Sequence, residues 1–82
     1  MKNNLNKLPT IIDGPGKYKT RSNKIIIINH IRPTSNQDRL EFNCMQQIFD
    51  RFGVVVMVKS WHKSGRVSQY SVSPIDIIEK ID

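Results

Sequence analysis

The feature that most constrains this chain is a run of four isoleucines, residues 25–28, which continues to Ile31. Isoleucine is β-branched and packs well on a pleated surface, so the run predicts a strand. Polar and turn residues border the run, which is typical of a strand buried on both faces or nearly so. Ser22 and Asn23 favour a turn just before it. A turn there would pair residues 17–21 with residues 24–31 as a hairpin.

The next stretch predicts an amphipathic helix over residues 35–52. Apolar residues recur at helical spacing from Leu40 to Phe52, which gives a helix one apolar face. Thr34 or Ser35 can be the N-cap, and after Ser35 the residue Asp38 stands in the position of the capping-box acid. Gly53 follows directly, where helices commonly end in a left-handed residue.

The remaining third of the chain predicts two strands and a short helix. The apolar residues 54–58 indicate a second buried strand that continues to Trp61. After a turn at residues 62–65, residues 66–72 alternate in polarity, which predicts a half-exposed strand antiparallel to the second. Ser73 and Pro74 favour a short C-terminal helical turn over residues 75–81.

Together these elements predict an α+β fold. A small, mainly antiparallel sheet of three or four strands would pack against the helix 35–52. The alternative is that the strands curl into a partly closed barrel. Residues 1–13, which are rich in Asn and Lys, are expected to form a loosely ordered N-terminal arm. Residues 14–82 are expected to form a single domain.

The charge of the chain is strongly positive and unevenly distributed. Thirteen Lys and Arg residues oppose seven Asp and Glu residues, which gives a net charge of +6. Nine of the thirteen cations lie in residues 14–37 and 51–75, and neither window contains an acidic residue. The positive electrostatic field of such a surface attracts nucleic acid or an acidic protein surface. The same charge distribution is also compatible with a basic surface that has no specific partner.

Several classes of protein are excluded or disfavoured. A single cysteine, Cys44, rules out an internal disulfide. Two histidines and one cysteine without close spacing make a poor metal site, and Gly14–Lys17 lacks the spacing of a phosphate-binding loop, so no metal or cofactor is expected. No apolar run reaches the ~20 residues of a membrane span, and residues 1–9 do not resemble a signal peptide. We therefore expect a cytoplasmic protein with no membrane partner.

The candidate binding residues combine cations for phosphate with rings for base stacking. They are Lys17, Lys19, Arg21, Lys24, Lys59, Trp61, His62, Lys63, Arg66 and Tyr70. For Trp61 a place in the core and a stacking role both remain open. No catalytic residue is expected, although His30 and His62 would be the acid and base if the protein were a nuclease.

Three segments resemble a pattern in small bacteriophage and prophage proteins. They are Tyr18-x-Thr20-Arg21, then Trp61 followed by Gly65-Arg66, then Asp76-Ile77-Ile78-Glu79. The members of this group are short β-rich modules, mostly without an assigned function. The resemblance implies a phage source and the host cytoplasm as location. The chain departs from the pattern by placing its predicted helix between the strands.

Three functional hypotheses follow. The first is a small basic module that binds RNA or single-stranded nucleic acid without catalysis. The second is a protein–protein inhibitor of a host or defence enzyme, which would present its cations to an acidic host surface. The third is a small metal-independent ribonuclease. The chain would act as a monomer or as a homodimer, and an exposed edge strand would favour the dimer.

Overall fold

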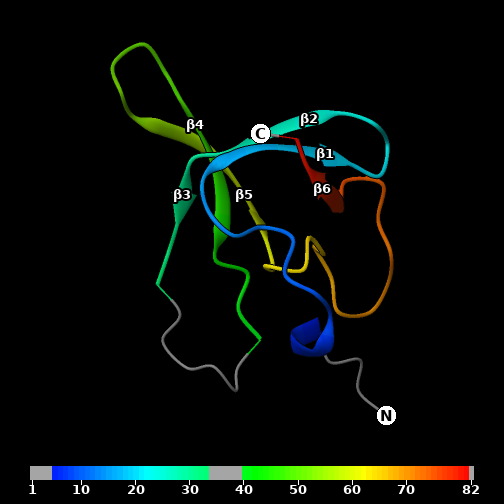
Figure 1. Cartoon of the computed structure of the whole chain (residues 1–82). Coiled ribbons are helices and arrows are strands. Elements are labelled where there is room, and N and C mark those ends of the chain that lie inside the picture. Colours follow the sequence, from blue (N-terminus) through cyan, green and yellow to red (C-terminus); the bar gives the residue numbers. More distant parts are fainter. Residues whose placement is uncertain (1–4, 34–39, 82) are drawn as a thin grey trace.

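The computed structural model describes residues 5–33 and 40–81. This part of the chain forms two three-stranded antiparallel sheets, a 3-10 turn and no α-helix (Figure 1). The elements are η1 (Leu5–Lys7), β1 (Gly16–Thr20), β2 (Ile25–Ile28), β3 (His30–Ile31), β4 (Cys44–Phe49), β5 (Val55–Trp61) and β6 (Ile77–Lys80).

The first sheet has the order β2-β1-β6. The predicted hairpin is confirmed, because β1 pairs with β2 antiparallel. Asn23 adopts a φ of 73° in the connecting turn, a conformation that Asn tolerates better than most residues. The N–H of Thr20 donates to the carbonyl of Lys24 at 2.8 Å, and the N–H of Lys24 donates to Thr20 Oγ1 at 3.0 Å. These bonds close the turn.

The second sheet has the order β3-β4-β5. Only Asn29 separates β2 from β3, so one extended stretch leaves the first sheet and enters the second. The Asn29 side chain holds the point of transition against β4 (Cys44–Phe49). Its amide donates to the Gln47 carbonyl at 2.9 Å, and its Oδ1 accepts from the Gln47 N–H at 2.8 Å.

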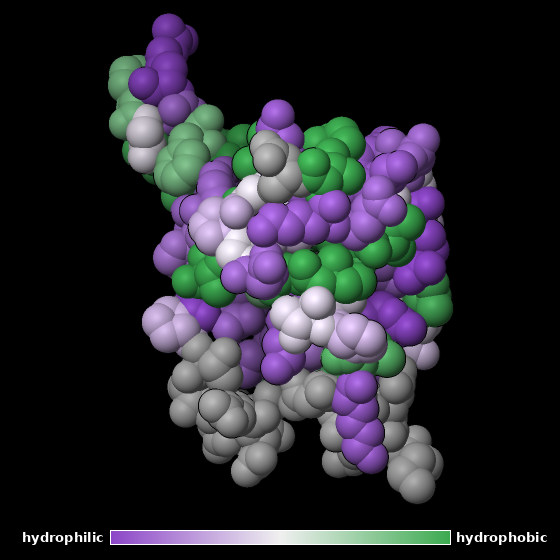
Figure 2. All heavy atoms as spheres, viewed as in Figure 1, coloured by the Kyte–Doolittle hydropathy of each residue, from purple (hydrophilic) through white to green (hydrophobic). Residues whose placement is uncertain are grey.

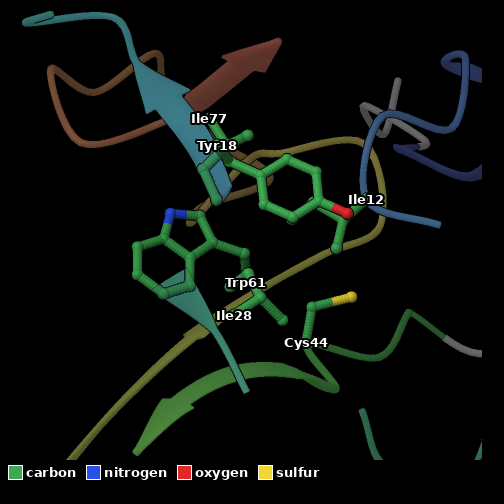
Figure 3. Close-up of a cluster of buried hydrophobic side chains, with 6 residues drawn as sticks. All are labelled: Ile12, Tyr18, Ile28, Cys44, Trp61 and Ile77. Atoms are coloured by element: carbon green, nitrogen blue, oxygen red, sulfur yellow. The ribbon is translucent and has the colours of Figure 1, made fainter. Parts of the chain in front are cut away.

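The hydrophobic core lies between the two sheets and is small. Its buried side chains point toward one another in Figure 3. They are Ile12, Tyr18, Ile28, Cys44, Trp61 and Ile77. The two large rings also satisfy their polar atoms: Trp61 Nε1 donates to the Ile75 carbonyl at 2.9 Å, and the Tyr18 hydroxyl donates to the Gly14 carbonyl at 2.6 Å.

The predicted helix 35–52 is wrong, and with it the α+β fold class. Residues 34–39 lie outside the described residues, and the rest of the segment forms β4 and a hairpin loop. In that loop the Asp50 carboxylate accepts from the N–H groups of Phe52 and Val54 at 2.8 and 3.0 Å. Gly53 has a φ of 81° there. A left-handed glycine closes a three-residue hairpin loop as well as it ends a helix, so the signal was assigned to the wrong element.

The predicted burial of the apolar runs is also wrong. Ile25 and Ile27 are 54% and 50% exposed, and residues 54–58 are all exposed. The isoleucine run has one covered face, on which Ile28 is buried, whereas residues 54–58 have no covered face. A run of apolar residues carries no information about whether such a cover exists.

The predicted strand 66–72 and the predicted helical turn 75–81 are likewise wrong. Residues 66–75 form an irregular loop, and β6 follows and pairs with β1. The Asp76 carboxylate holds the loop by accepting from the N–H groups of Val67 and Ser73 at 3.1 and 2.9 Å. These hydrogen bonds satisfy backbone N–H groups that, in a strand, would bond to a neighbouring strand.

The path of the loop makes Gly65 a sensitive position. Gly65 has a φ of 91°, and a Cβ added there would overlap the backbone carbonyl of Ile77. We expect Gly65→Ala to lower the free energy of unfolding by at least ~3 kcal/mol, from overlap together with left-handed strain. Urea denaturation followed by the fluorescence of Trp61, the single tryptophan, measures this loss.

Gly14→Ala is the matched control, because an added Cβ meets no atom within 4 Å at Gly14. We expect its free energy of unfolding to stay within ~0.5 kcal/mol of the parent protein. Similar losses for the two variants would contradict the described path of the chain at Gly65.

Candidate nucleic-acid interface

The centre of the candidate interface is the buried carboxylate of Asp76, whose side chain is fully inaccessible. Besides the two backbone bonds to the loop, its Oδ2 accepts from Arg21 Nη2 at 3.2 Å. Arg66 Nε lies 4.0 Å from the same oxygen. The carboxylate therefore brings together two predicted phosphate-binding cations, one from each acid-free window of the sequence.

The Arg21–Arg66 pair keeps an excess of positive charge. One carboxylate balances one of the two guanidinium groups, and both side chains remain partly exposed. Arg21 Nε also donates to the Ser73 carbonyl at 3.3 Å, which fixes the orientation of the group. A guanidinium has five N–H donors, so Arg21 retains donors for an added anion.

A hollow of about 240 Å³ lies beside this pair. It is lined by Arg21, Arg66, Ser64, Leu8, Pro9, Ile11, Ile77 and Ile78. Its walls are mainly apolar, while the two arginines supply charged groups. Such a combination suits a flat ring that carries an anionic group nearby.

The outer face of the first sheet carries part of the predicted cationic ribbon. Tyr18 and Thr20 are buried, so Lys17 and Lys19 point to the other face. Lys19 Nζ lies 3.7 Å from Glu79 Oε2, which neutralises it. Lys17 and Lys24 are exposed, and no carboxylate of residues 5–33 or 40–81 forms an ion pair with either.

The remaining predicted cations, Lys59 and Lys63, are also exposed. Lys59 lies on β5 in the second sheet, and Lys63 lies in the turn that follows. Neither forms an ion pair with a described carboxylate. The predicted set thus divides into the pair around Asp76, one lysine paired with Glu79, and four exposed lysines.

The predicted stacking residues differ sharply in exposure. Trp61 is fully buried and belongs to the core, which settles the two open alternatives for this residue. His62 is only 2% exposed. Tyr70 is 87% exposed on the irregular loop, so it is the member of the three whose ring a base can reach.

The surroundings of His62 disfavour its charged form. The N–H of Ser64 donates to His62 Nδ1 at 3.1 Å, and Phe42 packs against the ring with 6.0 Å between centroids. Burial, followed by the charge of Lys63, lowers the pKa of His62. The ring is thus part of the packing, whereas His30 is exposed on β3.

The described residues offer no metal centre, because no three His, Cys, Asp or Glu side chains among them gather at one place. Burial raises the pKa of Cys44 to about 11, so its thiol stays protonated near neutral pH. None of the helices in the described ranges has the length and apolar character to cross a bilayer.

Comparisons with protein-family models, with curated proteins and with solved structures give no match.

The role of Asp76 was not predicted from the sequence. Asp76 lay in the predicted helical turn 75–81, whereas its buried carboxylate accepts a hydrogen bond from Arg21 and forms an ion pair with Arg66. One signal was available: Asp76 is the first acidic residue after Asp50, so it had few competitors as a partner for Arg66. No comparable signal marked the hollow, since its lining comes from four separate parts of the chain.

The lowered pKa of His62 has a consequence for stability. A histidine whose pKa is depressed by folding stabilises the native state above its unfolded value of ~6.5, and this contribution is lost as pH falls below it. We expect the free energy of unfolding to decline between about pH 7 and pH 5. The decline should be shallower in His62→Gln, measured by urea denaturation at each pH.

His30→Gln is the control for this measurement, because His30 is the other histidine and is exposed. We expect it to keep the slope of the parent protein. Equal slopes for His62→Gln and the parent would contradict a buried neutral imidazole.

Proposed function

We propose that this protein is a non-catalytic module that binds RNA or single-stranded nucleic acid. The observation that carries the proposal is the hollow beside Arg21 and Arg66. Phosphate is well matched by guanidinium groups, which form paired, charge-assisted hydrogen bonds with it. The apolar walls from Leu8, Ile11 and Ile78 offer a surface for a base.

The exposed lysines extend the positively charged surface beyond the Arg21–Arg66 pair. Lys24 lies in the β1–β2 turn close in sequence to Arg21, and Lys63 precedes Ser64 of the hollow. Lys17 lies on the outer face of the first sheet. These side chains would follow the phosphates of a strand whose base occupies the hollow, with Tyr70 as a further stacking ring. Trp61 and His62 have no part in this interface because they are buried.

The wider setting rests on the sequence resemblance. A phage source would place the protein in the cytoplasm of the host cell, where RNA and single-stranded DNA are both accessible. The absence of catalysis is part of the proposal. The ribonuclease hypothesis is not favoured, because it would need His62 in a position to reach substrate.

A second candidate function is inhibition of a host or defence enzyme by direct protein contact. The observation that favours it is the set of exposed lysines that form no ion pair with a described carboxylate, because complementary charge steers association with an acidic protein surface. The two candidates predict different partners in host lysate. A partner lost on nuclease treatment supports the first, and a defined protein that survives the treatment supports the second.

Binding of a fluorescent single-stranded 20-mer, followed by anisotropy, tests the first candidate. With at least three phosphate contacts, affinity should fall roughly 10-fold or more between about 50 and 200 mM salt. The double variant Lys17→Gln/Lys24→Gln should make the slope of log affinity against log salt shallower by up to ~1.4, which is ~0.7 per contact. Affinity that does not change with salt would contradict the proposal.

The hollow is tested separately with Ile78→Glu, which adds a carboxylate beside the two arginines. We expect this change to weaken binding at least ~10-fold, by competing for the guanidinium groups. Ile75→Glu is the matched control, because Ile75 is similarly exposed but does not line the hollow. Equal losses for the two variants would show that net charge, and not the hollow, governs binding.

A further inference from the structure

The β4–β5 hairpin projects from the body of the protein as an arm (Figures 1 and 2). It carries many exposed apolar side chains; Phe52 is 80% exposed and Val56 is 60% exposed. Side chains alternate between the two faces of a strand, yet residues 54–58 are all exposed. The arm therefore has two uncovered apolar faces. A two-stranded hairpin of this kind is marginally stable on its own in water.

The outer strand of the arm also has an open backbone edge. β5 is at the end of the order β3-β4-β5 and pairs only with β4 among the described strands. Gln47 directs its N–H and carbonyl to the side chain of Asn29, which lies on the β3 side. Since antiparallel pairs alternate between bonded and non-bonded, its partner Val58 turns its own N–H and carbonyl outward.

We infer that β5 pairs antiparallel with β5 of a second copy, about a two-fold axis at Val58. The strand Val55–Trp61 has seven residues, and Val58 is the middle one. A two-fold axis there overlaps the whole strand with its copy. It also falls on a residue whose backbone groups point outward, as a bonded central pair requires. If the axis moved by one residue along β5, it would fall on a residue whose backbone groups point toward β4 and cannot bond to a second copy.

The same register suits the side chains. Lys59, the charged residue of β5, faces Met57 of the second copy and not the second Lys59, so like charges are not directly opposed. Val56 faces Ser60 of the second copy. Edge strands that avoid such pairing usually carry several charges or a proline, and β5 has one lysine and no proline.

The length of the arm indicates what else the second copy covers. In this register the tip of each arm, with Phe49, Phe52 and Val54, lies beside the Trp61 end of the other β5, where that strand enters its own body. A second copy therefore supplies hydrogen-bond partners for the open edge of β5 and places its own body beside the tip of the arm.

Sedimentation equilibrium on the full chain tests the inference. We expect a mass of about twice 9.5 kDa at micromolar concentration and in the absence of nucleic acid. Val58→Lys places two cations face to face at the axis, so it should raise the dimer dissociation constant at least ~100-fold. Gln47→Lys is the matched control: Gln47 faces Val58 across the hairpin, away from the edge, and this variant should remain dimeric.

A mixing experiment separates a lost interface from a lost fold. Val58→Glu alone should also be monomeric, and an equimolar mixture with Val58→Lys should regain the mass of a dimer, because opposite charges then meet at the axis. A monomeric parent protein would overturn the inference, and so would a mixture that stays monomeric. The dimer does not depend on the proposed nucleic-acid function, since salt-dependent binding to the hollow and the mass of the free protein are independent readouts.

Discussion

The buried carboxylate of Asp76 is the interaction on which the rest of the structure depends. It joins the irregular loop 66–75, the β1–β2 turn through Arg21, and the start of β6. A buried charge is costly unless hydrogen bonds and an opposite charge offset its desolvation. Here backbone N–H groups and a guanidinium meet that requirement. The same arrangement positions Arg66, so the anchor of the fold also creates the proposed phosphate site.

Local turn chemistry made part of the fold predictable, and burial did not follow from it. The turn at Asn23 and the left-handed Gly53 were recognised from residue type alone. The apolar spacing of residues 40–52 fits a helix, yet Cys44–Phe49 is a strand because β3 and β5 flank it on both sides. Such pairing is set by distant residues, which no local pattern records.

The cations of the candidate site could be predicted from the sequence, but their positions relative to one another and to their acidic partners could not. The charge windows identified Arg21, Arg66 and the lysines, but ion pairing with Asp76 and Glu79 depends on how loops return to the first sheet. The ring of Trp61 could not be assigned from strand parity, because its burial depends on the elements packed against it. What the fold adds is a body that carries an arginine-lined hollow, and an arm with exposed apolar residues that projects from this body (Figure 2).

The dependence of the structure on the Asp76 carboxylate is tested most directly by comparing the free energies of unfolding of Asp76→Asn and Glu79→Gln. Glu79 is exposed and forms one surface ion pair, so its loss should cost less than ~1 kcal/mol. Removing the buried charge should cost about 3–5 kcal/mol, because the Arg21 and Arg66 guanidinium groups lose their counter-charge and an amide NH2 replaces one of the two acceptor oxygens. If Asp76→Asn were as stable as Glu79→Gln, the loop, the turn and β6 would not depend on this carboxylate.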